Sequence, residues 1–120
     1  MPIQSFRDLL VWQRAVALAK EMYHVAEGFP ERESYGLRGQ MCRAAVSIAS
    51  NIAEGKRRKT RKDFVQFLHI ADGSAAELET QILIAESAYP HMDFARASGL
   101  LDEVQKMLGG MLKKLEHPAV

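Results

Sequence analysis

Cysteine is nearly absent from this sequence, because the 120 residues include one, Cys42. One cysteine cannot form an internal disulfide bond, which excludes the small secreted domains that depend on several such bonds. Cys42 lies in an apolar stretch, where we expect a small buried side chain. The lack of disulfide bonds is typical of a reducing compartment, and we therefore expect a cytoplasmic protein.

Long hydrophobic runs are also missing. The longest uncharged stretch extends from Ala44 to Ala53, far short of the roughly 20 apolar residues that span a bilayer. Arg7, Asp8 and Arg14 interrupt the start of the chain, which therefore lacks the hydrophobic segment of a signal peptide. We expect neither secretion nor a membrane partner.

Proline and glycine are scarce, at 4 and 8 residues, and no low-complexity tract is present. Apolar residues recur at helical spacing almost throughout, and no segment alternates with the period of a strand. Four helices are predicted, over residues 6–27, 34–55, 60–89 and 93–116, with Thr60 as an N-cap. Short connections favour antiparallel neighbours. The sequence therefore predicts one all-α domain over residues 1–120, an antiparallel up-down-up-down four-helix bundle.

The apolar stripes of these helices define the expected core. The inward positions are Leu9, Trp12, Val16, Ala19, Tyr23 and Ala26 in the first helix, Leu37, Met41, Ala44, Ile48 and Ile52 in the second, Phe64, Phe67, Leu68, Ala71, Ala75, Leu78 and Ile82 in the third, and Leu101, Val104, Leu108, Met111 and Leu115 in the fourth.

The second predicted helix has too little polar surface for a solitary bundle. Opposite its core stripe lie Val46, Ala49 and Ala53, so the stretch between residues 44 and 53 has no charged face. A helix that is apolar nearly all round is buried on more than one side. We therefore predict that these three residues form an interface between copies of the chain.

A polar stripe borders the core of the same helix and can meet a similar row on the third helix. Because an unpaired buried polar group costs about 1 to 3 kcal/mol, we predict a structural hydrogen-bond network, with Arg43 and Glu54 as a buried ion pair. The alternative is a ligand or substrate pocket built from these groups. The expected members are Arg43, Ser47, Asn51, Glu54, Ser74 and Glu77.

Residues 56–62, Lys-Arg-Arg-Lys-Thr-Arg-Lys, place six cations in seven positions of a predicted loop. The chain as a whole has a net charge of +1, so this cluster is a local feature. Arginine and lysine pair well with phosphate, and we predict nucleic-acid binding by Lys56, Arg57, Arg58, Lys59, Arg61 and Lys62. The alternative is a solvated loop. Few aromatic side chains are expected nearby, because Phe64 and Phe67 are assigned to the core.

The residues that carry catalysis in other proteins do not form a pattern here. Metal sites in helical bundles use two Glu-x-x-His pairs, whereas this sequence has one, Glu21 with His24, on a face predicted to be exposed. Neither Cys42 nor Ser47 has a histidine at helical spacing. We therefore predict no catalytic residue, no metal site and no cofactor.

Several short motifs occur in an order that resembles one protein family, the four-helix bundle proteins encoded in intervening sequences of 23S ribosomal RNA. These motifs cover about residues 5 to 88. They are Phe6-Arg7-Asp8-Leu9 with Val11-Trp12-Gln13, Phe29-Pro30, Tyr35-Gly36-Leu37 with Gln40, Arg43-Ala44-Ala45-Val46-Ser47-Ile48, Ser50-Asn51-Ile52-Ala53-Glu54-Gly55, Phe64, Phe67-Leu68, Ile70-Ala71, Gly73-Ser74 and Glu77-Leu78-Glu79-Thr80-Gln81.

The resemblance implies a four-helix bundle whose relatives form ring-like homopentamers and have no established catalytic activity. The chain is also similar, more loosely, to the accessory protein of diversity-generating retroelements, a basic pentamer that binds nucleic acid and a reverse transcriptase. Our leading interpretation is a non-enzymatic homo-oligomer that binds RNA, DNA or a nucleic-acid enzyme through residues 56–62. The alternatives are a scaffold that binds only protein, and an enzyme or ligand-binding protein that uses the polar stripe.

Overall fold

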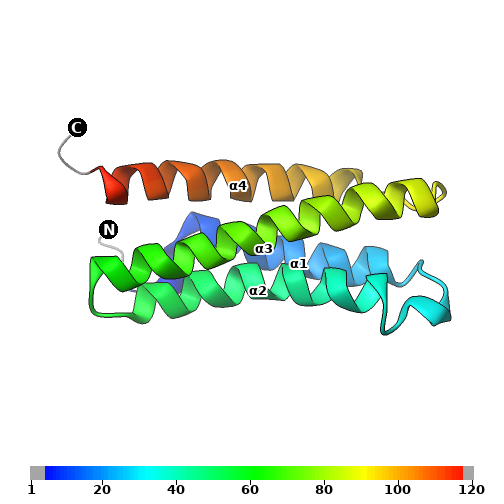
Figure 1. Cartoon of the computed structure of the whole chain (residues 1–120), viewed down its shortest axis with the longest axis horizontal. Coiled ribbons are helices and arrows are strands. Elements are labelled where there is room, and N and C mark those ends of the chain that lie inside the picture. The colour runs from blue at the N-terminus through cyan, green and yellow to red at the C-terminus, as the bar shows by residue number, and fades with distance from the viewer. Residues whose placement is uncertain (1–4, 118–120) are drawn as a thin grey trace.

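Four α-helices make up the fold (Figure 1). The computed structural model describes residues 5–117, and within this range all regular structure is helical. The elements are the 3-10 turn η1 (Phe6–Asp8), α1 (Leu10–Ala26), the 3-10 turn η2 (Glu31–Glu33), α2 (Leu37–Arg57), α3 (Arg61–Ala88) and α4 (Ala95–Glu116). Consecutive helices run in opposite directions along a molecule 48 Å long (Figure 1). The prediction of an all-α four-helix bundle is confirmed.

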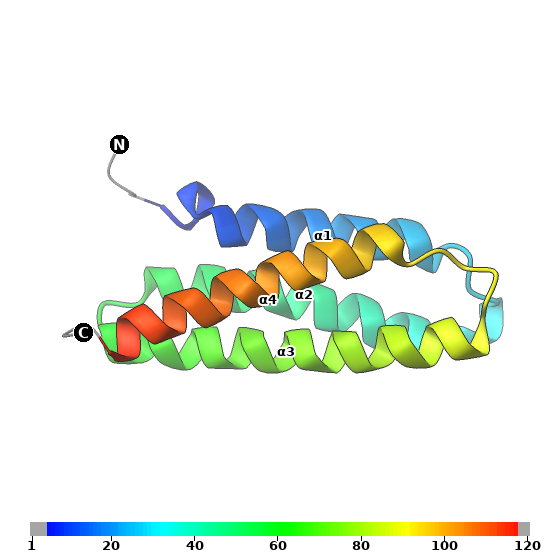
Figure 2. The same ribbon diagram turned by 90° about the horizontal axis from the view of Figure 1, so that it is seen from above.

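Each helix packs against two others, and the pairing of α2 with α3 is the most extensive. α4 lies obliquely across the bundle, with its last turns over α3 (Figure 2). Exposed ion pairs join it to both neighbours: Arg14 Nε lies 2.6 Å from Glu103 Oε2, and His69 Nε2 lies 3.2 Å from Glu116 Oε2. Because such pairs contribute about 1 kcal/mol or less, apolar packing supplies most of the stability of the bundle.

The buried side of α1 differs from the predicted one. Leu9 and Ala26 are buried as expected, but Tyr23 is 54% exposed, and Trp12, Val16 and Ala19 are partly exposed. This part of the prediction was wrong by roughly a quarter turn of the helix wheel. Two adjacent stripes of α1 are apolar, and helical periodicity cannot decide between them. The buried residues of α1 are Val11, Ala15, Leu18, Met22 and Ala26.

The core stripe of α2 agrees with the prediction, because Met41, Ala44, Ile48 and Ile52 are all buried. Cys42 is also buried, and burial raises the pKa of its thiol. The helix begins at Leu37, three residues later than expected. Its first turn is capped from outside, since the backbone amide of Leu37 donates a hydrogen bond to the Glu33 carboxylate at 3.1 Å.

Gly55 does not end α2 as predicted, and the helix continues to Arg57. This glycine is needed for packing. A Cβ placed on it would lie 2.7 Å from the Cβ of Phe67 and 3.1 Å from a ring carbon of Phe64. The two helices therefore meet at a distance that no other residue type fits without movement of α3.

The third and fourth helices follow their predicted stripes except near the end of the bundle that holds the last turns of α4. Thr60 is the N-cap of α3 as predicted, and its Oγ1 accepts a hydrogen bond from the Asp63 amide at 3.1 Å. Phe64 and Phe67 are only partly buried, contrary to expectation. In α4 the core residues include Leu112, whereas the predicted Met111 and Leu115 remain partly exposed.

A hydrogen-bonded clamp closes the opposite end of the bundle. Tyr89 Oη donates to Glu33 Oε2 at 2.5 Å, while the other oxygen of this carboxylate caps α2. The ring of Tyr89 also packs edge-on against Phe29, with centroids 5.3 Å apart. These bonds, first that from Tyr89, lower the pKa of Glu33, and the bond to Glu33 raises the pKa of Tyr89.

We expect the Gly55→Ala substitution to destabilise the protein by about 1 to 3 kcal/mol, because its methyl group overlaps Phe67. Gly73→Ala is the matched control, since a Cβ at Gly73 meets nothing within 4 Å, and there alanine should stabilise α3 by about 0.5 to 1 kcal/mol. Urea unfolding followed by circular dichroism measures both. A Gly55→Ala variant as stable as the wild type would contradict the close approach of the two helices.

The clamp predicts how stability depends on pH. The pKa of Glu33 is lower in the folded protein than its ordinary value of 4.5, so its contribution is complete above that value and is lost as pH falls through the folded pKa. The pKa of Tyr89 is raised from 10.0, so its contribution is lost as pH rises through the folded pKa. Glu33→Gln should flatten the acid limb of the profile of urea midpoint against pH, and Tyr89→Phe the alkaline limb. Unchanged limbs in both variants would exclude the clamp.

Candidate functional site

The six predicted phosphate-binding cations lie at one end of the bundle, but most of them are helical. Lys56 and Arg57 belong to the last turn of α2, and Arg61 and Lys62 to the first turn of α3. Only residues 58–60 form the connection, so the predicted loop 56–62 is shorter than expected. Lys56 is half-buried and the other five cations are exposed.

The helix ends strengthen the positive potential of this region. Lys56 and Arg57 stand at the negative end of the α2 dipole, which they complement. Arg61 and Lys62 stand at the positive end of the α3 dipole, where cations repel the helix end unless an anion is present. Asp63 supplies one negative charge in this first turn. The start of α3 therefore has an excess of positive charge that a bound phosphate would neutralise.

Further cations lie at the same end of the molecule. The last turn of α4 carries Lys113 and Lys114, and η1 carries Arg7. Figures 1 and 2 place η1, the connection between α2 and α3, and the end of α4 at the same end of the bundle, with η1 on the α1 side and the end of α4 over α3. We call this region the cationic end. Its members are Arg7, Lys56, Arg57, Arg58, Lys59, Arg61, Lys62, Lys113 and Lys114.

The opposite end is mainly acidic. It is formed by the connection between α1 and α2, the last turns of α3 and the connection that follows them (Figure 1). Arg32 lies in these segments, and Arg38 and Arg96 lie in the adjoining first turns of α2 and α4. Carboxylates outnumber these three arginines, so the two ends of the bundle differ in the sign of their net charge. The carboxylates are Glu27, Glu31, Glu33, Glu86 and Asp93.

Three phenylalanine rings lie beneath the charges of the cationic end. The Arg58 guanidinium carbon is 4.8 Å from the centroid of the Phe67 ring, and Lys56 Nζ is 5.9 Å from that of Phe64. Arg7 lies over Phe6 at 6.0 Å. The expectation that aromatic side chains are few near this cluster was therefore wrong. Periodicity assigned Phe64 and Phe67 to the core, but the fully buried core ends before it reaches the first turns of α3.

The predicted polar network is smaller than expected. The hydroxyl oxygens of Ser47 and Ser74 lie 2.8 Å apart and join α2 to α3. The Asn51 amide donates to the backbone oxygen of Ser47 at 2.8 Å and to its hydroxyl at 3.0 Å. These three residues are half-buried.

The other three members lie outside this network. Arg43, Glu54 and Glu77 are exposed, and Glu54 pairs with Arg58 at 3.4 Å. The expected ion pair of Arg43 with Glu54 fails because the two residues, although on one flank of α2, are three turns apart, or about 16 Å. Gln81 lies in the polar row of the third helix but was not among the six expected members; it is 7% exposed, and its Oε1 has no hydrogen-bond partner among the described residues.

An apolar surface groove lies between α1 and α2. Val46, which is 40% exposed, and Ala49 line it from α2, and Tyr23 lines it from α1. Its volume is about 420 Å³, and Lys20 is its one charged lining residue. Ala53, the third predicted interface residue, is partly exposed and lies outside the groove. The residues that line the groove are Val16, Ala19, Lys20, Tyr23, Val46, Ala49 and Ser50.

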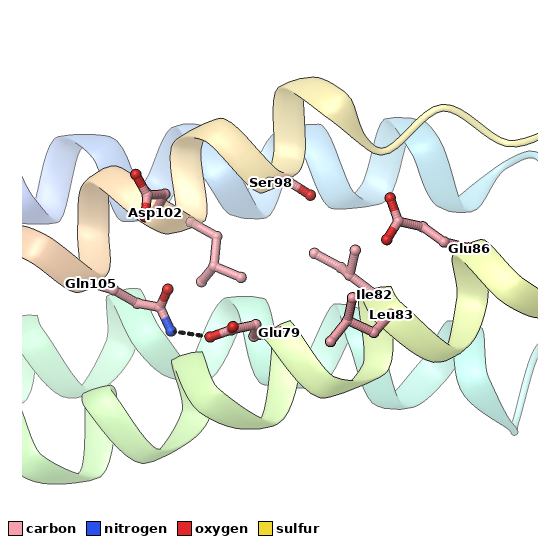
Figure 3. A pocket seen from close by; sticks show the side chains of 8 residues that line it. Glu79, Ile82, Leu83, Glu86, Ser98, Asp102 and Gln105 are labelled. Carbon is pink, nitrogen blue, oxygen red and sulfur yellow. Dashed lines mark hydrogen bonds between the residues drawn. The ribbon is translucent and has the colours of Figure 1, made fainter.

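A second groove, between α3 and α4, has an apolar floor and an acidic rim (Figure 3). Ile82 and Leu83 form part of the floor, and the volume is about 240 Å³. Gln105 donates a hydrogen bond to Glu79 at 2.9 Å across it. The rim carboxylates are Glu79, Glu86 and Asp102.

The Glu21 and His24 pair lies beside His91 and Asp93 in a further surface pocket. Glu21 faces Arg96 of α4, at 3.6 Å, and its side chain is largely buried, contrary to the prediction of an exposed face. Among residues 5–117 no three His, Cys, Asp or Glu side chains converge as metal ligands. Within the same range, no helix is long and apolar enough to cross a membrane.

The architecture and the charges define a class of protein, a small antiparallel four-helix bundle with one cationic end. A family model for the 23S rRNA-intervening sequence protein matches residues 7–110. The chain therefore belongs to the 23S rRNA-intervening sequence protein family, as the motifs suggested.

A solved structure gives independent support for the fold. It is a protein with unknown function from the S23 ribosomal protein family of Bacteroides thetaiotaomicron. The two superpose with a TM-score of 0.76 at 21% sequence identity, over 87% of this chain and 99% of the other. No curated protein matches the chain in sequence.

Proposed function

We propose that this chain is a non-enzymatic, homo-oligomeric binding protein that engages RNA or DNA, or an enzyme bound to nucleic acid, through its cationic end. The observation that carries this proposal is that three chain segments rich in lysine and arginine lie at one end of the bundle. Residues 56–62 alone would be an ordinary solvated turn. With Arg7, Lys113 and Lys114, the cations at this end outnumber the carboxylates of the same segments, which are Asp8, Glu54, Asp63 and Glu116.

Phosphate is the chemistry that this surface fits best. Each phosphate that a lysine or arginine neutralises releases a counterion, and the free energy gained depends on the salt concentration. The amides at the start of α3 add donors for an anion. The cations come from helices, whose spacing is fixed, and their pattern suits the backbone of a nucleic acid more than a particular base sequence.

The proposal predicts a salt-dependent affinity for nucleic acid. Fluorescence anisotropy with a labelled 20-nucleotide RNA should give a linear fall of log K with log salt. The double variant Arg57→Gln/Lys59→Gln should reduce the magnitude of the slope by about 1.4, since each lost phosphate contact of a single strand removes about 0.7. Neutralising all six cations of residues 56–62 should abolish most of the binding.

The matched control neutralises the same number of charges away from the cationic end. Arg32 lies in η2 and Lys106 on the outer side of α4, and both are exposed. Arg32→Gln/Lys106→Gln should leave the slope unchanged. Equal slopes for the two double variants would exclude the cationic end as the binding surface.

Self-association is the second part of the proposal. Val46 and Ala49 line a groove that Tyr23 extends onto α1, so the apolar area left to water is larger than the single stripe of α2 that the sequence indicated. Covering it with a second copy removes this area from water. In a closed ring each copy would add its own cationic end, and the ring would hold several phosphates at once.

Val46→Glu should therefore lower the mass of the particle, because it places a charge in the apolar groove. Light scattering coupled to size exclusion should give a multiple of 13.4 kDa for the wild type and a smaller particle for the variant. Ala95→Glu, at an exposed position in the first turn of α4, is the control and should leave the mass unchanged. A wild-type particle of 13.4 kDa would contradict self-association.

The same experiments separate the two alternatives. A scaffold that binds only protein would keep the oligomer and show no salt-dependent affinity for RNA. A ligand-binding or enzymatic role for the polar stripe would need free donors and acceptors at its centre. Ser47, Asn51 and Ser74 bond to one another, which supports a structural role for the stripe.

A further inference from the structure

Arg58 differs from the other cations of residues 56–62 in how it is held. Its guanidinium lies 4.8 Å from the centroid of the Phe67 ring. Its Nε lies 3.4 Å from Glu54 Oε2, one helical turn earlier. The side chain is nevertheless 46% exposed. The guanidinium thus contacts a ring and a carboxylate, and nearly half of the side chain faces solvent.

The position of Phe67 follows from the packing of the two helices. Gly55 allows α2 to approach α3 so closely that the Cβ of Phe67 lies against it. Arg58 follows as the C-cap of α2, with its backbone amide bonded to the carbonyl oxygen of Gly55 at 3.1 Å. Backbone packing therefore places the Phe67 ring beside the start of the Arg58 side chain, and the ring and Glu54 offer the guanidinium two contacts before any ligand binds.

We propose that Arg58 is a stacking platform for an unpaired base, which makes the cationic end prefer single-stranded nucleic acid to a duplex. This inference rests on the proposed function. A guanidinium is planar and stacks on π systems, so one held against Phe67 can stack a base on its other face. A duplex keeps its bases stacked and paired inside the helix, and it meets the same surface only through phosphates.

The other cations of residues 56–62 lack this geometry, and Arg7 lies farther from its ring, at 6.0 Å from the centroid of Phe6. Lys56 also lies over a ring, at 5.9 Å from the centroid of Phe64, but an ammonium group has no plane on which a base could stack. For Arg57 and Arg61 no ring contact is present within residues 5–117. Arg57 is thus a close match for Arg58 in charge and location, and differs from it in having no aromatic support.

The experiment replaces each arginine by lysine, which keeps the charge and removes the plane. Three labelled 12-nucleotide DNA ligands have equal numbers of phosphates per strand: a single strand of mixed adenine and cytosine, an abasic strand of the same length, and the single strand paired with its complement. Affinities are measured by fluorescence anisotropy at several salt concentrations, and circular dichroism checks that each variant is folded.

The wild type should bind the strand with bases about fivefold or more tightly than the abasic strand, as expected for stacking of at least one base. Arg58→Lys should remove this difference, and because the charge is kept, the salt slopes should stay those of the wild type. Arg57→Lys should change the affinities for the strands with and without bases by the same factor and so retain the difference. Arg58→Trp restores a flat stacking surface without the charge. It should recover part of the difference in affinity between the strands with and without bases.

Two results overturn the inference. If the wild type binds the strands with and without bases equally, no base stacks on the protein. If Arg57→Lys and Arg58→Lys lose the same amount, the support from Phe67 has no effect on binding. In both cases salt-dependent binding persists and the proposed function stands. If none of the three ligands binds with a salt dependence, the proposed function fails as well.

Discussion

At Gly55 the backbones of α2 and α3 lie so close that one methyl group would overlap a neighbouring side chain. Small side chains are also common among the buried residues of these two helices, where Ala44, Ala45, Ala71 and Ala75 are all buried. Small side chains let helices approach, and a close approach brings polar groups such as the hydroxyls of Ser47 and Ser74 within hydrogen-bond distance. The α2 and α3 pair therefore has the most extensive contact in the bundle, and α1 and α4 pack onto it.

The position of the cationic end depends on this pair. The connection between α2 and α3 is short because the helices are close, so the cations before and after it are brought onto one surface. The same approach places Phe64 and Phe67 beneath Lys56 and Arg58. A looser pairing would leave the charges in a longer turn without aromatic support. The close approach of α2 and α3 thus determines both the packing of these helices and the contacts between cations and rings at the cationic end.

Much of this fold follows from the sequence, and the failures have specific causes. The core of α2 could be predicted because the large side chains of Met41, Ile48 and Ile52 share one stripe of the helix. The core of α1 could not, since Val16 and Ala19 are as apolar as Val11 and Ala15, and the choice between the stripes depends on how the other helices pack. The predicted pair of Arg43 and Glu54 failed for another reason. The two residues share a flank of the helix, but the distance between them along the helix axis was not taken into account.

The candidate site was predictable in its charge but not in its structure. The cluster of six cations in residues 56–62 can be recognised in the sequence itself. That Lys113 and Lys114 lie at the same end of the bundle depends on the direction of α4. The rings beneath the charges were assigned to the core because periodicity continues past the point where the core ends. Gln81 shows the reverse case, a polar residue beside the core stripe of α3 that is buried more completely than Ser74 and Glu77 on the same flank.

An even number of antiparallel helices returns the chain to the side of the molecule on which it started. Here η1 and the last turn of α4 both lie at the end that carries the cations (Figure 1). An affinity tag or fused domain attached to either terminus would therefore stand next to this surface and could screen it. The connection between α1 and α2, where Tyr35 is 95% exposed, is the better position for a fluorophore or an inserted domain, because it lies a full bundle length away.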